Sequence, residues 1–162
     1  MACCKSCPPM WEQLRRFSAL ERPARGVFLR ASLLLPLISL SLRLRGFQRT
    51  QNLLRRFLSP QGPSVKVVAP ERTVLMARMV RAAVCHGIGR STCLEESLAL
   101  WWLLGREGIT SDLRIGIRKH AERFEAHAWI EREGKALNEP EARHQHYTAF
   151  EAAFSGLPPE TR

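Results

Sequence analysis

The sequence predicts an α+β protein, with helices in the first two thirds of the chain and strands after them. In the first part, apolar residues such as Leu29, Leu33 and Leu37 recur every three or four positions, which is the period of a helix. Further along, Leu113 and Ile115 alternate with polar or small residues, which is the period of a strand. Helices and strands are therefore expected to be segregated along the chain.

The positive charge of the chain is concentrated in its N-terminal third. Residues 1–60 contain 11 Lys and Arg against 2 Asp and Glu, for a net +9, whereas residues 61–162 contain 14 against 13, for a net +1. Such a basic segment suits an acidic peptide, an anionic membrane or nucleic acid. Its helices lack interleaved aromatic residues and any nucleic-acid motif, so we expect no nucleic-acid partner. Peripheral contact with a membrane through residues 33–44 is a further expectation.

Proline and glycine divide the chain into segments. Three prolines and one glycine within residues 59–70 interrupt helices and mark a linker. The expected divisions are a tail at residues 1–17, a basic helical region at 18–58, the linker at 59–70, a core at 71–154 and a tail at 155–162. Within the helical region, Pro36 should kink the helix and Gly46 should end it. Met1 and Met10 are both candidates for the native start.

The cysteines form a poor disulfide framework. The chain has five of them, an odd number, and three fall within its first seven residues. This usage predicts a reducing, cytoplasmic location. Cys4 and Cys7 have the spacing of a metal-binding pair, but no second pair of ligands follows, whereas a structural metal site needs about four. We therefore expect no metal site and no cofactor.

The second half of the chain is predicted to contain two helices, then strands joined by a hairpin loop, and then a last helix. The expected elements are helices at residues 71–86 and 93–104, strands at 112–118 and 124–131, a hairpin loop at 132–135, a return strand at 136–139 and a last helix at 147–154. Thr92 and Glu95 have the spacing of a capping box, which predicts that the second of these helices begins next to Cys93.

Cys93 is the candidate nucleophile. It falls in the first turn of a predicted helix, where unpaired N–H groups and the helix dipole favour a thiolate, the reactive form of cysteine. The alternative is that Cys93 is a small buried apolar residue. Cys85, near the end of an apolar helix, is interpreted as a core residue.

His127 is the candidate base. It lies in a predicted strand, which aims its side chain rigidly, and Ala126 and Ala128 on either side leave room for another group. A histidine at such a position can also be purely structural.

A third group must orient the imidazole, and either Asn138 or Glu139 on the return strand could do so. A two-residue hairpin loop would place Asn138 on the His127 face, and a three-residue loop would place Glu139 there. The sequence alone leaves both open.

Two motifs in this order and spacing resemble the lasso-peptide biosynthesis B proteins. The first is Cys-Leu-x-x-Ser-Leu-Ala-Leu at residues 93–100, and the second is Ala-His-Ala-Trp at 126–129. These proteins are leader peptidases of the transglutaminase-like superfamily. The resemblance implies a papain/transglutaminase-like core, in which a nucleophile-bearing helix packs on a small antiparallel sheet, with an N-terminal helical extension. It implies a Cys-His-Asp triad in which Cys93 and His127 match directly and Glu139 stands at the aspartate position. Asn138 is the alternative third member, as in papain-type sites.

The resemblance also implies a function and partners. The expected activity is removal of the leader from a ribosomally synthesised precursor peptide by a cysteine peptidase. The implied partners are that precursor peptide, a separate PqqD-like leader-binding protein and an asparagine-synthetase-like lasso cyclase. The alternatives are a transglutaminase-like amidase or transferase acting on another peptide, and a catalytically inactive basic binding module.

Overall fold

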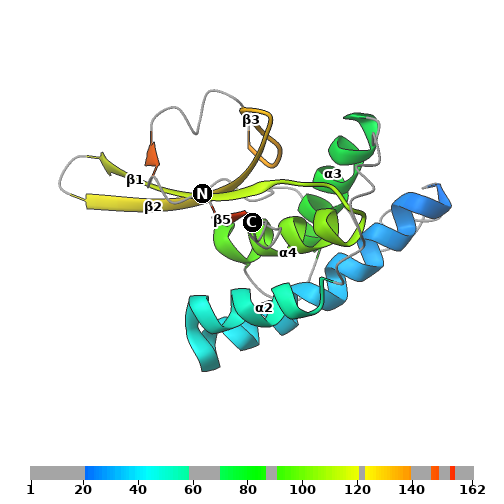
Figure 1. The fold of residues 1–162 in the computed structure, drawn as a ribbon, viewed down its shortest axis with the longest axis horizontal. Helices are drawn as coiled ribbons and strands as arrows, with labels where there is room; N and C mark the ends of the chain where they lie inside the picture. The colour runs from blue at the N-terminus through cyan, green and yellow to red at the C-terminus, as the bar shows by residue number, and fades with distance from the viewer. Residues whose placement is uncertain are drawn as a thin grey trace, which may run out of the picture.

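The computed structural model of the protein describes residues 21–58, 70–86, 91–120, 123–139, 147–149 and 154–155. Its elements are the helices α2 (Arg22–Arg56), α3 (Pro70–His86) and α4 (Cys93–Arg106) and the strands β1 (Asp112–His120), β2 (Arg123–Arg132), β3 (Lys135–Ala136), β4 (Thr148–Ala149) and β5 (Phe154–Ser155). Helix α4 lies at the centre: α2 and α3 pack against it and against each other, and β1 and β2 cover another side (Figure 1). The predicted α+β class is confirmed.

Helix α2 reverses direction at Gly46. Its φ of 74° and ψ of 177° interrupt the helix there, and a positive φ favours glycine. The hydroxyls of Ser41 and Thr50 are only 2.9 Å apart, although nine residues of straight helix would separate their backbones by about 13.5 Å. Figure 1 shows the chain doubling back. The expected stop at Gly46 is confirmed, whereas Pro36 is accommodated inside the helix and is not where the helical dihedrals break.

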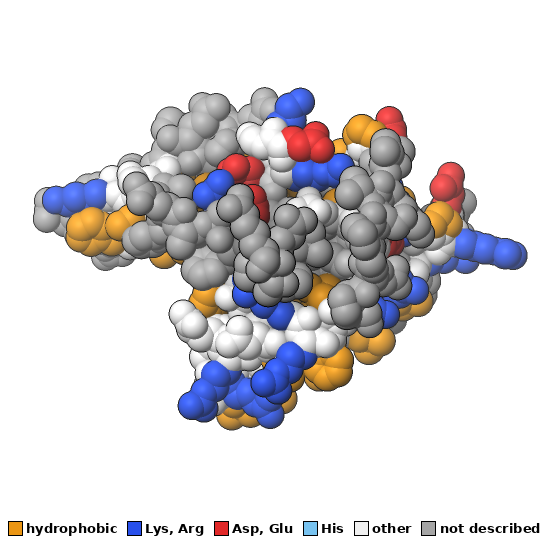
Figure 2. Space-filling view, viewed as in Figure 1, with side chains coloured by type: hydrophobic (Ala, Val, Ile, Leu, Met, Phe, Trp, Pro, Cys, Tyr) orange, Lys and Arg blue, Asp and Glu red, His pale blue; other side chains and the backbone are white. Residues whose placement is uncertain are grey.

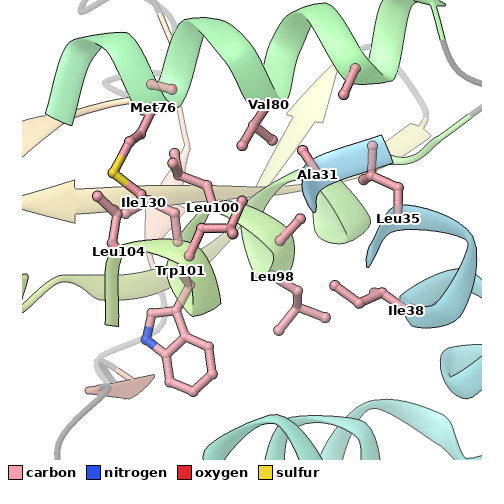
Figure 3. Close-up of a cluster of buried hydrophobic side chains, with 14 of the residues drawn as sticks. Ala31, Leu35, Ile38, Met76, Val80, Leu98, Leu100, Trp101, Leu104 and Ile130 are labelled. Atoms are coloured by element: carbon pink, nitrogen blue, oxygen red, sulfur yellow. The ribbon is translucent and has the colours of Figure 1, made fainter. Parts of the chain in front are cut away.

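The core is built around α4, which is buried on nearly all sides because the helices α2 and α3 and the sheet surround it. The side chains that meet there are apolar (Figure 3): Ala31, Leu35 and Ile38 from α2, Met76 and Val80 from α3, Leu98, Leu100, Trp101 and Leu104 from α4, and Ile130 from β2. From Leu98 to Leu104 the helix is apolar all round, which suits such a position. The core therefore fixes where the N-terminus of α4 meets β2.

The sheet is antiparallel, with strand order β3-β2-β1-β4, and β5 also pairs with β1. Gly116 lies opposite His127 in the long β1–β2 hairpin. Between β2 and β3, the loop consists of Glu133 and Gly134, which both have positive φ, as a two-residue type I′ turn requires.

The predicted last helix at residues 147–154 is wrong. This part of the chain contains β4 and the start of β5, which pair with Gly116, Ile117 and Leu113 of β1. The second edge of β1 needs hydrogen-bond partners, and supplying them outweighs a local helical pattern. Of the predicted segments, the tail at 1–17 lies outside the described residues, as does the linker except for Pro70, the first residue of α3. Ser155, expected in the C-terminal tail, belongs to β5.

Candidate active site

Cys93 is the first residue of α4, and the predicted capping box holds it there. The Glu95 N–H donates to the Thr92 hydroxyl at 3.3 Å, and the Thr92 N–H donates to the Glu95 carboxylate at 2.6 Å. This reciprocal pair fixes the start of the helix. The Cys93 side chain is thereby presented at the positive end of the helix dipole.

The surroundings of Cys93 favour a thiolate. Burial alone would raise the pKa of the thiol, because a thiolate loses stability away from water. Hydrogen bonds from the His127 ring and from the N–H groups of Ala128 and Leu94, together with the charge on His127, outweigh burial and hold the pKa of Cys93 below its ordinary value. The groups that lower the pKa of Cys93 thus come from both α4 and β2.

His127 carries the complementary charge. The hydrogen bond to Cys93 and then the contact with Glu139 raise the pKa of His127 to about 9, although burial opposes them. A lowered pKa of the Cys93 thiol beside a raised pKa of the His127 ring favours a thiolate–imidazolium pair. This is the charge state from which a cysteine nucleophile attacks.

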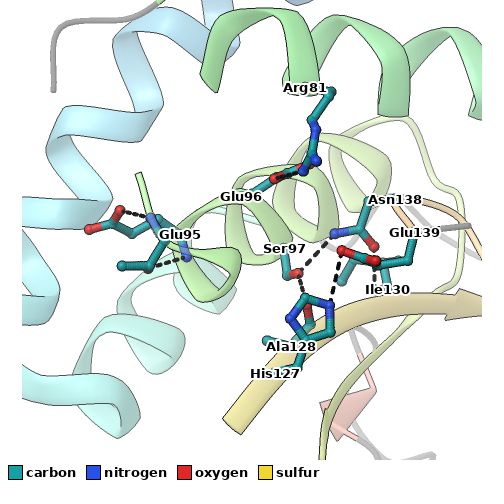
Figure 4. Close-up of polar contacts among 10 residues, drawn as sticks. Arg81, Glu95, Glu96, Ser97, His127, Ala128, Ile130, Asn138 and Glu139 are labelled. Atoms are coloured by element: carbon teal, nitrogen blue, oxygen red, sulfur yellow. Dashed lines mark hydrogen bonds and ion pairs between the residues drawn. The ribbon is translucent and has the colours of Figure 1, made fainter. Parts of the chain in front are cut away.

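Glu139 faces the other side of the imidazole. Its Oε1 lies 3.0 Å from His127 Nε2, and its side chain is only 5% exposed. Figure 4 shows this contact. Because Nε2 is the ring atom in contact with Glu139, Nδ1 is the ring nitrogen left for the Cys93 thiol. The structure thus brings together Cys93, His127 and Glu139, in the order that nucleophile–base–orienting group chemistry requires.

Asn138 has a different position. Its side-chain oxygen accepts from the Ile130 N–H at 2.8 Å, and its side-chain nitrogen donates to the Ser97 hydroxyl at 3.0 Å. Ser97 in turn donates to the Ala128 carbonyl at 3.0 Å (Figure 4). Asn138 therefore ties the chain after β3 to both β2 and α4, and it is Glu139 that contacts the imidazole.

The length of the hairpin loop does not decide which side chain reaches His127. The hairpin loop has two residues, which by strand alternation would place Asn138 on the His127 face. However, the backbone ladder ends where the Leu137 N–H donates to the Ile130 carbonyl at 2.8 Å. The next donor on β2, the Ile130 N–H, is taken by the Asn138 side chain rather than by a strand carbonyl. The chain leaves the sheet there, and alternation no longer decides which side chain reaches His127.

Replacing Asn138 with Ala should destabilise the protein by roughly 1–3 kcal/mol, because it leaves the Ile130 N–H without its acceptor in a buried place. Urea unfolding measures this free energy. Asn52→Ala, at an exposed position on α2, is the matched control and should change stability by no more than about 0.5 kcal/mol. Equal effects of the two substitutions would contradict the assigned role of Asn138.

Two aromatic rings lie beside His127. The Trp129 ring is stacked at 6.2 Å between centroids, and the Tyr147 ring lies at 5.2 Å with a tilt of 36°. Gly116 makes this arrangement possible, since a Cβ there would lie 3.0 Å from both Trp129 and Tyr147. The guanidinium of Arg118 lies 4.8 Å from the centre of the Tyr147 ring. These rings restrict the imidazole to the orientation that Glu139 favours.

A second charged pair lies behind the site. The Arg81 guanidinium of α3 donates to the buried Glu96 carboxylate of α4 at 2.7 Å (Figure 4). Burial raises the pKa of Glu96, an effect that Arg81 partly offsets, and the charges of Glu139 and His127 also act on it. Arg81 therefore supplies a positive charge that acts on the carboxylates of both Glu96 and Glu139.

Cys93, His127 and Glu139 were predicted from the sequence, but their neighbours in the site were not. Tyr147 could not be found, since it reaches the site through strand pairing with a distant part of the chain. Ser97 did carry a signal, because it falls one turn after Cys93 within the first motif. In the parts of the chain that the structure describes, no group of three or more His, Cys, Asp or Glu side chains is arranged to hold a metal. Cys4 and Cys7 lie outside those parts.

Comparison with known proteins gives one match. A family model described as the transglutaminase-like superfamily matches residues 34–152, which is most of the chain. No curated protein and no solved structure matches. The matched range contains α4, the β1–β2 hairpin and all three residues gathered at the site.

Proposed function

Because the chain belongs to the transglutaminase-like superfamily, which includes cysteine peptidases, we propose that it is a cysteine peptidase that removes the leader from a lasso precursor peptide. The observation that carries the chemical part of this proposal is the thiol of Cys93, which is hydrogen-bonded to an imidazole that Glu139 contacts from the other side. The choice of substrate is supported by the two motifs, Cys-Leu-x-x-Ser-Leu-Ala-Leu and Ala-His-Ala-Trp.

The proposed reaction is acyl transfer to sulfur. The Cys93 thiolate attacks the scissile carbonyl carbon, and the oxyanion that forms accepts from the Cys93 N–H, one of the first-turn donors without an intrahelical acceptor. The imidazolium of His127 then gives its proton to the leaving amine as the C–N bond breaks. Neutral His127 next takes a proton from water, which attacks the thioester and releases the acid and the thiolate. Glu139 stabilises the imidazolium in both halves of the reaction.

The proposed partners follow from the substrate. The precursor peptide would be delivered by a separate PqqD-like leader-binding protein, and the trimmed peptide would pass to an asparagine-synthetase-like cyclase. A reducing cytoplasm suits this chemistry, because the nucleophile must remain a free thiol. Cys93 is a free thiol in the structure.

Replacing Cys93 with Ala should abolish leader removal, because the acyl group then has no sulfur to bind. The measurement is mass spectrometry of a lasso precursor peptide incubated with the protein and the leader-binding partner. Cys85→Ala, which removes the partly buried thiol on α3, is the matched control and should leave cleavage unchanged. Full cleavage by the Cys93 variant would contradict the proposal. Transfer of the acyl group to an added amine in preference to water would identify the chain as a transferase.

A further inference from the structure

The face of α2 that points away from the core carries a row of exposed leucines. This leucine stripe consists of Leu29, Leu33, Leu37, Leu40 and Leu44, whose exposed fractions range from 52% to 74%. At about 100° per residue the five fall within an arc of about 80°. Val27, Ala31 and Ile38, which pack into the core, lie on the opposite side of the same helix. The first leg of α2 is therefore apolar on two faces, and the core uses only one of them.

Positive charge borders the leucine stripe. Helix α2 contains eight arginines and no acidic residue. On the same helical projection, Arg30 and Arg43, which are both exposed, fall on opposite sides of the stripe. Arg45 just before the break at Gly46, together with Arg49 and Arg56 on the second leg, lines a hollow in the surface. Figure 2 shows apolar and basic side chains gathered along the lower side of the molecule, where Figure 1 places most of α2, and no acidic side chain is visible on that side.

We infer that the leucine stripe docks on an anionic lipid bilayer, with α2 lying in the plane of the interface. Apolar side chains between rows of arginine suit a surface that offers acyl chains beneath negative headgroups. The absence of any acidic side chain along α2 gives the helix a single sign of charge, and lipid phosphates complement it.

The sequence and packing of α2 favour a helix that lies on the membrane surface over one that crosses the membrane. By length and composition alone, α2 is apolar enough to cross a bilayer. However, the uncharged run between Arg30 and Arg43 covers only residues 31–42, whereas a spanning helix needs about 20 apolar residues. The face formed by Ala31, Leu35 and Ile38 is also committed to the core. Only the stripe is left for lipid.

This orientation keeps the candidate site accessible. Helix α4 lies between α2 and the sheet that carries His127, so a bilayer beneath α2 is on the far side of α4 from that sheet. The inference concerns α2 alone and does not depend on the proposed peptidase function, since vesicle binding and cleavage are measured separately.

Vesicle flotation tests the inference. The purified full chain should float with vesicles containing equal parts of phosphatidylglycerol and phosphatidylcholine, less with phosphatidylcholine alone, and less again at high salt. The double variant Leu33→Gln/Leu37→Gln should lower partitioning by roughly 10–100-fold, and Arg30→Glu/Arg43→Glu by roughly tenfold or more. The controls are Val74→Gln and Arg78→Glu, exposed apolar and basic positions on α3 that should have little effect.

Three outcomes would overturn the inference. The first is no flotation with anionic vesicles. The second is flotation that the leucine variant leaves unchanged, because charge alone would then explain binding. The third is a wild-type protein that does not bind vesicles but self-associates, as measured by light scattering, while the leucine variant is monomeric. The leucine stripe would then be covered by a second copy of the chain.

Discussion

The His127→Ala variant should cleave its peptide substrate roughly 10²–10⁴-fold more slowly than the wild type, measured as kcat/KM at neutral pH. The substitution removes two contributions to catalysis. Without the imidazolium, the pKa of Cys93 rises, because His127 supplies both a hydrogen bond and a positive charge that stabilise the thiolate. The leaving amine also loses its proton donor. Single-turnover measurements would separate the two, because alkaline pH restores the thiolate but not the proton donor.

His86→Ala is the control for this experiment. His86 is an exposed histidine at the end of α3, outside the candidate site, so its replacement should leave kcat/KM unchanged. If His127→Ala retained full activity while remaining folded, His127 could not be the base.

The Glu139→Gln variant should narrow the pH range of activity. Glu139 is the second cause, after Cys93, of the raised pKa of His127, so removing its charge moves that pKa from about 9 toward the ordinary value of about 6.5. Activity needs the imidazolium and is lost as pH rises through the pKa of His127, so the alkaline limb should shift to lower pH. The thiolate also loses support, so the acidic limb should shift to higher pH. At pH 7, kcat should fall by about 10²–10⁴-fold.

Two controls make the Glu139→Gln result specific. Glu133→Gln removes a carboxylate from the exposed hairpin loop and should leave both limbs in place. Asn138→Ala should lower stability without moving the alkaline limb, because Asn138 holds the backbone and does not contact the imidazole in the structure. If the alkaline limb shifted in the Asn138→Ala variant and did not shift in the Glu139→Gln variant, Asn138 rather than Glu139 would be the group that orients His127.

Local sequence signals were sufficient for the elements that carry Cys93 and His127. The capping box of Thr92 and Glu95 placed the start of α4 correctly, because both halves of that motif lie within four residues. Alternation likewise predicted β1 and β2, although burial does not follow it along their whole length: Ala128, Trp129 and Ile130 are buried in succession, and Phe124 is exposed. The break in α2 was predicted at Gly46, where the backbone does adopt a positive φ.

The parts that sequence reasoning missed depend on distant contacts. Strands β4 and β5 exist because β1 has a second edge to be paired, a fact that residues 147–155 do not encode by themselves. The position of Glu139 depends on the Asn138 side chain replacing a strand carbonyl, which no periodicity reveals. The exposed leucines of α2 had the right period for a helix, but period alone does not say which of two apolar faces meets the core.

The pairing of Cys93 with His127 is tested most directly by alkylation of the thiol. Wild-type protein and His127→Ala are titrated with iodoacetamide across pH, and the modified cysteines are mapped by mass spectrometry. We predict that Cys93 reacts well below the pKa of a free thiol, about 8.5, that Cys85 does not, and that the advantage disappears without His127. A wild-type Cys93 that is inert, or that titrates like a free thiol with and without His127, would contradict the thiolate–imidazolium pair and favour a binding module over an enzyme.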